Sequence, residues 1–280
     1  MIVRVAGTEL TMNGVGTSAG EHEISLEAYG VRMAVGATSS DVLERARLLL
    51  PPGWKPCPRS EVQRRFRIAS EDTGTYALTK DGRVTNNGLG LELALALLET
   101  ELRLWVARKA PGAIFIHAGV VGHHDLTIVI PGVSFAGKTT LVAALVRHGA
   151  TYYSDEFAVL DEHGFVRPYA KPLSLRDDNK MQTEHPVESL GGVAGDEPLR
   201  IGAIVVTSYR PGAVWQPRRL SPGEGAMALL ANAVPARERP VEAMRAITRC
   251  SEGAIAIESD RDEADAIAPL LLAEVERLAA

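Results

Sequence analysis

Polar and apolar residues alternate along the first part of the chain, a pattern typical of strands with one exposed face. Residues 22–35 alternate in this way with an interruption at Gly30, which predicts a pair of strands. Further elements are expected before residue 110: a helix over 41–50 capped by Ser39 or Ser40, strands around 65–68 and 75–78, and a long helix over 91–108. We therefore expect residues 1–110 to form a small α+β module that serves partner recognition, oligomer contact or structural support.

The second part of the chain begins with two apolar segments, 114–121 and 126–130, that both precede its first helix. The short turn 122–125 between them predicts a hairpin rather than a parallel crossover. The elements expected later are a helix over 141–148, strands over 151–160, 165–169, 201–207 and 254–257, a polar insertion over 177–198, and helices over 223–234, 241–248 and 262–278. We therefore expect residues 111–280 to form an α/β domain whose sheet is mixed and partly antiparallel, unlike a doubly wound sheet.

Composition narrows the class of protein. The chain has 280 residues, of which 46% are hydrophobic and 23% are charged, as in soluble globular proteins. A net charge of −5 argues against nucleic acid as the main partner. Cys57 and Cys250 lack a metal-type spacing, and the chain shows neither a signal peptide nor an apolar run of the roughly 18 residues that a membrane span needs. We expect a cytoplasmic protein with no membrane partner.

One motif carries most of the functional information. Residues 132–139 fit the pattern G-x-x-x-x-G-K-[ST], between a predicted strand and a predicted helix. In this motif glycines let backbone N–H groups surround phosphate oxygens, the lysine reaches the β- and γ-phosphates, and the hydroxyl residue ligates Mg²⁺. The residues predicted to bind nucleotide are Gly132, Ser134, Ala136, Gly137, Lys138, Thr139 and Thr140, with Thr139 also as a metal ligand. The motif predicts binding of a nucleoside triphosphate, with ATP and Mg²⁺ as the expected pair.

Three further features, an acid pair, a histidine and an arginine, are candidates for chemistry. Asp155 and Glu156 lie inside the predicted strand 151–160, where unpaired acids cost several kcal/mol. One of them is expected to hold Mg²⁺ and the other to accept the proton of an attacking hydroxyl. His117 lies in an apolar strand and is either a catalytic group or a satisfied core residue. Arg176 either stabilises charge on the γ-phosphate or is a solvated arginine.

The order of these features resembles the HPr kinase/phosphorylase family, whose core is related to phosphoenolpyruvate carboxykinases. The resemblance covers 114–176: a histidine in the strand before the motif, the motif itself, and an acid pair one strand later followed by a hairpin. It implies that His117 is the active-site histidine, that Asp155 accepts the proton of the target serine, and that Glu156 is the Mg²⁺-associated acid. Glu156 departs from the family pattern, which has aspartate there.

The segments 117–121, 153–156 and 172–176 are also similar to HPr-kinase-related bacterial proteins that accompany peptide-modification genes. This similarity implies a protein or peptide acceptor, for example a modified-peptide precursor, and a homo-oligomer is a further expectation. The sequence thus predicts an ATP- and Mg²⁺-dependent serine kinase. Two alternatives stay open: a non-catalytic ATP-binding regulatory or assembly protein, and a kinase of a small molecule such as free serine.

Overall fold

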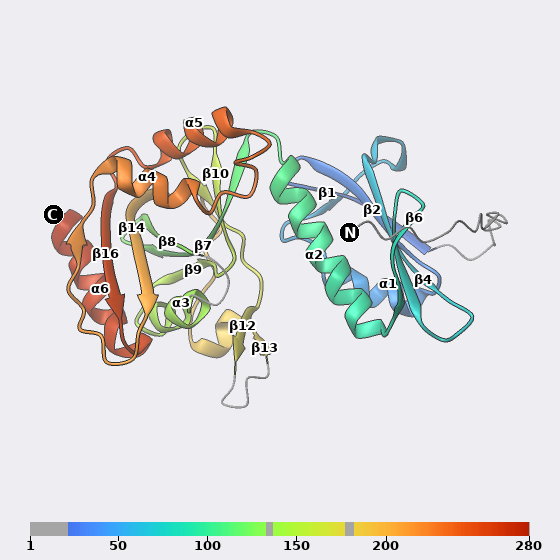
Figure 1. Cartoon of the computed structure of the whole chain (residues 1–280), viewed down its shortest axis with the longest axis horizontal. Helices are drawn as coiled ribbons and strands as arrows, with labels where there is room; N and C mark the ends of the chain where they lie inside the picture. The colour runs from blue at the N-terminus through green and yellow to red at the C-terminus, as the bar shows by residue number, and fades with distance from the viewer. Residues whose placement is uncertain (1–21, 133–136, 177–181, 280) are drawn as a thin grey trace, which may run out of the picture.

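The computed structural model describes residues 22–132, 137–176 and 182–279, and it is a mixed α/β structure with two main sheets (Figure 1). Elements from the first part of the chain occupy one end of the long axis, and those after residue 112 occupy the other. No helix in the described ranges combines the length and apolar character needed to cross a bilayer.

The first sheet has six strands in the order β3-β1-β2-β4-β5-β6. Its strands are β1 (His22–Ala28), β2 (Val31–Ala37), β3 (Lys55–Pro56), β4 (Arg64–Ser70), β5 (Tyr76–Lys80) and β6 (Arg83–Leu89). The predicted strand pair is confirmed, since β1 and β2 are antiparallel and turn at Tyr29 and Gly30, both with positive φ. Helices α1 (Ser40–Arg47) and α2 (Leu91–Lys109) confirm the two predicted helices, and Ser39 caps α1. Strand β6 was not predicted because almost all of its residues are exposed and they show no alternation of apolar and polar positions.

The second sheet contains the motif strand. Its order is β11-β10-β7-β8-β14-β16-β15, with β9 also paired to β7. The strands are β7 (Ala113–His123), β8 (Leu126–Pro131), β9 (Thr151–Ser154), β10 (Phe157–Asp161), β11 (Val166–Arg167), β14 (Arg200–Tyr209), β15 (Arg218–Arg219) and β16 (Ile255–Arg261). The predicted hairpin is confirmed as β7–β8, and β8 lies between antiparallel β7 and parallel β14. The prediction of a mixed, partly antiparallel sheet is therefore confirmed.

Helices cover both faces of the second sheet because its strands are apolar on both sides. Helices α3 (Lys138–Arg147) and α6 (Ala264–Ala279) pack on one face with Ile128 and Ile130, whereas α4 (Pro222–Leu230) and α5 (Pro240–Cys250) pack on the other with Val129. The remaining elements are β12 (Leu173–Arg176), β13 (Gln182–His185) and the short 3₁₀ helices η1 (Arg59–Glu61) and η2 (Val187–Leu190). Part of the predicted polar insertion 177–198 forms β13, which pairs with β12 in a hairpin.

Strand β7 organises the α3 face through the alternation of its side chains. Phe115 joins the core shared with the first sheet and α2. Four residues on, Gly119 lies under α3, where an added Cβ would come within 2.6 Å of Val142. Val121 belongs to the core beneath α3 and α6. His117 lies between Phe115 and Gly119 on this face, at the junction of α2 and α3.

The predicted strand 151–160 is corrected by the structure, which divides it into β9 and β10 with Asp155 and Glu156 in a bend between them. The Ser154 hydroxyl accepts hydrogen bonds from the backbone N–H groups of Glu156 (3.1 Å) and Phe157 (2.9 Å). A short side-chain oxygen that binds nearby backbone in this way favours a turn over a continuous ladder. The two acids therefore lie at a break in the strand and not in its middle.

Candidate functional site

The segment between β8 and α3 carries the phosphate-binding motif, and its second glycine has a defined structural role. Gly137 is the N-cap of α3 with φ of 75°. An added Cβ would lie 2.5 Å from Nη2 of Arg261, which donates a hydrogen bond of 2.8 Å to the Gly137 carbonyl. Both the backbone conformation and the space therefore require glycine. The predicted residues Ser134 and Ala136 lie outside the described residues.

A single cavity of about 450 Å³ opens at the start of α3. It brings together most of the predicted site residues, namely His117, Gly137, Lys138, Thr139, Thr140, Asp155 and Glu156. The predicted Gly132 lies beside it, and its backbone N–H donates to the His117 carbonyl (3.2 Å). The predicted Arg176 is the last residue of β12, and its side chain lies outside the part of the chain that the structure describes. A larger apolar groove between α4 and α5 contains none of the predicted residues.

Asp155 is largely enclosed, with 8% of its surface exposed. The Tyr152 hydroxyl lies 3.0 Å from Oδ1 of Asp155 and 2.8 Å from the carbonyl oxygen of Lys171. Burial, followed by the negative charge of Asp155, raises the pKa of Tyr152, so this hydroxyl keeps its proton. One hydroxyl proton therefore serves two acceptors, and Tyr152 donates to one of them at a time.

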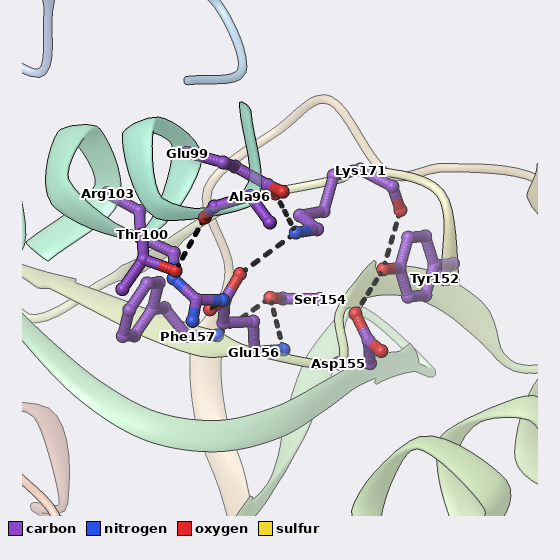
Figure 2. Close-up of polar contacts among 10 residues, drawn as sticks. All are labelled: Ala96, Glu99, Thr100, Arg103, Tyr152, Ser154, Asp155, Glu156, Phe157 and Lys171. Carbon is purple, nitrogen blue, oxygen red and sulfur yellow. Dashed lines mark hydrogen bonds and ion pairs between the residues drawn. The ribbon is translucent and has the colours of Figure 1, made fainter. Parts of the chain in front are cut away.

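Glu156 is held by two cations (Figure 2). It forms an ion pair with Arg103 of α2, and Nζ of Lys171 lies 3.3 Å from its Oε2. Lys171 also contacts Oε1 of Glu99 at 2.8 Å. Burial opposes the charge on Lys171, but the attraction of Glu156 and Glu99 outweighs it, so the pKa of Lys171 is raised. The predicted Mg²⁺-associated acid is thus already compensated by side chains of the protein.

Sequence reasoning missed Arg103 and Glu99, because α2 was assigned to a supporting module. A signal was nevertheless present in the helix spacing. Ala96, Glu99, Thr100 and Arg103 follow the i, i+3, i+4, i+7 pattern, and all four line the cavity. A polar stripe on a leucine-rich helix indicates a face that does not pack into a core. Here that face contacts Glu156 through Arg103 and Lys171 through Glu99 (Figure 2).

Replacing Arg103 with glutamine tests this contact. Glu156 has a side chain that is 13% exposed, so the loss of its strongest partner should destabilise the fold by about 2 kcal/mol. Urea unfolding followed by circular dichroism measures the change. The double variant Arg103→Gln/Glu156→Gln should recover part of the loss, since it leaves no uncompensated acid. Arg108→Gln, an exposed change on the same helix, is the control. Equal stability of Arg103→Gln and Arg108→Gln would contradict the structure.

His117 is a neutral imidazole in this environment. Its ring centroid lies 5.0 Å from that of Phe157. Burial lowers its pKa, and the positive charges of Lys138 and Arg103 lower it further. A neutral ring can accept a hydrogen bond from a substrate or donate one, depending on its tautomer.

The lowered pKa of His117 predicts a pH dependence of stability. In the unfolded chain His117 takes up a proton near the ordinary histidine pKa of 6.5, whereas in the folded chain its pKa is lower. The unfolded state thus binds more protons below that value, so stability should fall as the pH drops through about 6.5. Urea unfolding of wild type and His117→Gln at two pH values measures this slope. The slope should be shallower in His117→Gln but unchanged in His148→Gln, an exposed control at the end of α3. Parallel pH slopes for wild type and His117→Gln would contradict a half-buried ring with a lowered pKa.

Two further cations border the motif. Burial lowers the pKa of Lys138, while Asp155 and Glu156 act in the opposite direction. Arg261 is only 2% exposed, burial lowers its pKa, and its Nε has no hydrogen-bond partner among the described residues. Partly desolvated cations next to a helix N-terminus favour a bound anion. The cavity thus brings partly buried cations and a helix N-terminus close to the carboxylate of Asp155.

Comparison with known proteins gives a distant similarity only. No protein-family model and no curated protein matches the chain. Among solved structures, the Hpr(Ser) kinase/phosphatase from Coxiella burnetii is similar over 59% of this chain and 94% of that chain, with 11% identity and a TM-score of 0.28. A similarity at this level carries no information about the chemistry of individual residues and places the chain in no family.

Proposed function

We propose that the chain is an ATP- and Mg²⁺-dependent kinase that transfers the γ-phosphoryl group to a serine hydroxyl on a protein or peptide. One observation carries the proposal: a single cavity holds Lys138 and Thr139 of the phosphate-binding motif together with the carboxylate of Asp155. Phosphoryl transfer needs both, a cradle for the phosphates and a group that receives the proton of the acceptor. The fold of the HPr kinase type, with residues 111–280 as the kinase domain, belongs to the same proposal.

The residues of the cavity fit the nucleotide and its metal ion in part. Lys138 and the N-terminus of α3 provide positive charge for the β- and γ-phosphates. The Thr139 hydroxyl is a hard oxygen donor of the kind that Mg²⁺ prefers. Glu156 would hold a metal ion in competition with Arg103 and Lys171, which already balance its charge. The bound ion would supply charge neutralisation on the phosphates.

Four side chains of this protein would then perform the remaining tasks. Asp155 would orient the serine hydroxyl and take its proton as transfer proceeds. His117, neutral and next to the start of α3, would support that carboxylate or hydrogen-bond the transferred group. Arg103 and Lys171 would keep Glu156 in place and balance its charge. Since a serine hydroxyl is a poor acid, positioning and electrostatics contribute most of the acceleration.

The involvement of α2 supports a macromolecular acceptor. Helix α2 follows directly on the first sheet and presents Glu99, Thr100 and Arg103 to the cavity. Residues 1–110 would therefore contribute to acceptor recognition as well as to structural support. A small acceptor such as free serine would not require so large an additional surface.

One observation favours a second function, a non-catalytic nucleotide-binding regulatory or assembly protein. Arg103 and Lys171 form ion pairs with Glu156, whereas Asp155 forms none among the described residues. Asp155 is therefore the acid that is more readily available to a metal ion. A binding module needs only one acid near Mg²⁺, whereas the kinase reaction as proposed uses two.

Transfer of labelled phosphate separates these functions. The protein is incubated with γ-labelled ATP, Mg²⁺ and candidate acceptors, which are serine-containing peptides, proteins and free serine. The kinase proposal expects label on a peptide or protein serine. Label on free serine would indicate the small-molecule kinase. Saturable ATP binding without any transfer would support the non-catalytic module and overturn the kinase.

A further inference from the structure

A cluster of two histidines and a glutamate lies at the far end of β7 from the phosphate-binding motif. Nε2 of His123 and Nε2 of His124 lie 2.9 Å and 3.0 Å from the same oxygen, Oε1 of Glu276. The three ligand-type atoms all lie within 4.8 Å of one another. His123 ends β7, His124 opens the turn to β8, and Glu276 belongs to the last turn of α6.

The local backbone brings the two imidazoles together. His124 and the next residue, Asp125, both have positive φ, of 47° and 60°, in a two-residue hairpin turn. Glycine or asparagine is preferred at such positions, so a histidine there is conformationally costly. The ring centroids of His123 and His124 lie 4.3 Å apart. The turn thus places a second imidazole next to the first, facing one carboxylate.

The position of Glu276 also favours a cation. Acidic residues near the C-terminus of a helix interact unfavourably with the negative end of the helix dipole. Glu276 lies three residues before the end of α6, and the two imidazoles are its partners there. A positive charge bound by all three groups would relieve this interaction.

We propose that His123, His124 and Glu276 bind one divalent cation of the zinc class. Two imidazoles and one carboxylate are a ligand set that suits Zn²⁺ and does not suit Mg²⁺. In a tetrahedral site with bonds of about 2.0–2.2 Å, the ligand atoms lie roughly 3.3–3.6 Å apart, so each imidazole nitrogen would move away from Oε1 of Glu276 by roughly half an ångström. Each neutral imidazole would direct the lone pair of Nε2 to the ion and carry its proton on Nδ1. The fourth position would stay open to water or another donor.

The site is separate from the nucleotide cavity. His123 is six residues beyond His117 on β7, which corresponds to about 20 Å along an extended strand. The ion would link the β7–β8 hairpin to α6, which packs against α3 in the same core. Its expected role is therefore to fasten the C-terminal helix, and its binding does not depend on kinase activity.

Metal titration tests the proposal. The full chain is used after any affinity tag has been removed and bound metal has been stripped by a chelator. Calorimetry with Zn²⁺ in excess Mg²⁺ should show one ion per chain, and Co²⁺ should give the visible absorption of a tetrahedral complex. Zn²⁺ should also raise the melting temperature, since a ligand of the folded state stabilises it.

Variants make the test specific. His124→Ala and Glu276→Gln should weaken Zn²⁺ binding by about tenfold or more and abolish the thermal shift. Glu274→Gln, on the same helix but paired with Arg277, should bind normally. His163→Ala should also bind normally, since His163 has a neighbouring glutamate but no second imidazole. Absence of saturable Zn²⁺ binding, or equal binding by wild type and Glu276→Gln, would overturn the site and leave the cluster as hydrogen bonds alone.

Discussion

Replacing Asp155 with asparagine should reduce phosphoryl transfer by about 10²- to 10⁴-fold while leaving nucleotide binding nearly unchanged. The amide has the shape of the carboxylate and can still hydrogen-bond the Tyr152 hydroxyl, so the cavity should keep its form. It cannot take up the proton of a serine hydroxyl, and general-base catalysis contributes a factor of this size. Single-turnover transfer from γ-labelled ATP measures the rate, and calorimetry measures nucleotide affinity.

Two controls make the Asp155 result interpretable. Glu162→Gln removes a charge of the same sign from the exposed turn after β10 and should have wild-type activity. Tyr152→Phe removes the hydroxyl partner but keeps the carboxylate, and should reduce transfer far less than Asp155→Asn does. Full transfer by Asp155→Asn would falsify its role as proton acceptor. A parallel loss of affinity and transfer would instead make Asp155 a binding residue.

Replacing Lys138 with alanine should weaken both nucleotide binding and turnover. Lys138 begins α3 and lines the cavity, where burial lowers the pKa of its ammonium group and a bound phosphate would favour the charged form. The loss of one preorganised positive donor at a phosphate should reduce transfer by about 10²- to 10³-fold. Titration with a fluorescent ATP analogue measures the binding.

The matched control for Lys138 is Lys55→Ala, which removes an exposed lysine from β3. This variant should bind and turn over nucleotide like the wild type. Circular dichroism of both variants establishes that they are folded. If Lys138→Ala binds ATP as tightly as Lys55→Ala does, the motif is not a phosphate site, and both functions proposed for the cavity would fail together.

The sequence was most informative where local patterns determine structure. The β7–β8 hairpin and helix α3 follow from apolar runs separated by turn residues, and both were predicted. The bend at Asp155 and Glu156 was not, because it depends on the Ser154 hydroxyl binding two backbone N–H groups and not on the hydrophobic pattern. Two short strands joined by such a bend have nearly the same pattern as one long strand.

The prediction of the site was incomplete because some of its contacts join residues that are far apart in the sequence. His117, Lys138 and Asp155 were selected by their neighbours in the chain, and they line one cavity. Arg103 lies 53 residues before Glu156, and no local pattern connects the two. Their pairing depends on how α2 packs against the second sheet. Tertiary contacts of this kind therefore change what a predicted metal ligand can do.

The Tyr152 hydroxyl has one hydrogen to share between the carboxylate of Asp155 and a main-chain oxygen. If Asp155 gains the hydrogen of an incoming alcohol, it becomes a donor itself and no longer needs the phenol's. Tyr152 would then donate to the carbonyl of Lys171 alone, and both acceptors that compete for its hydrogen before the event would be satisfied after it. This exchange of hydrogen-bond partners would couple protonation of Asp155 to the position of the backbone at Lys171.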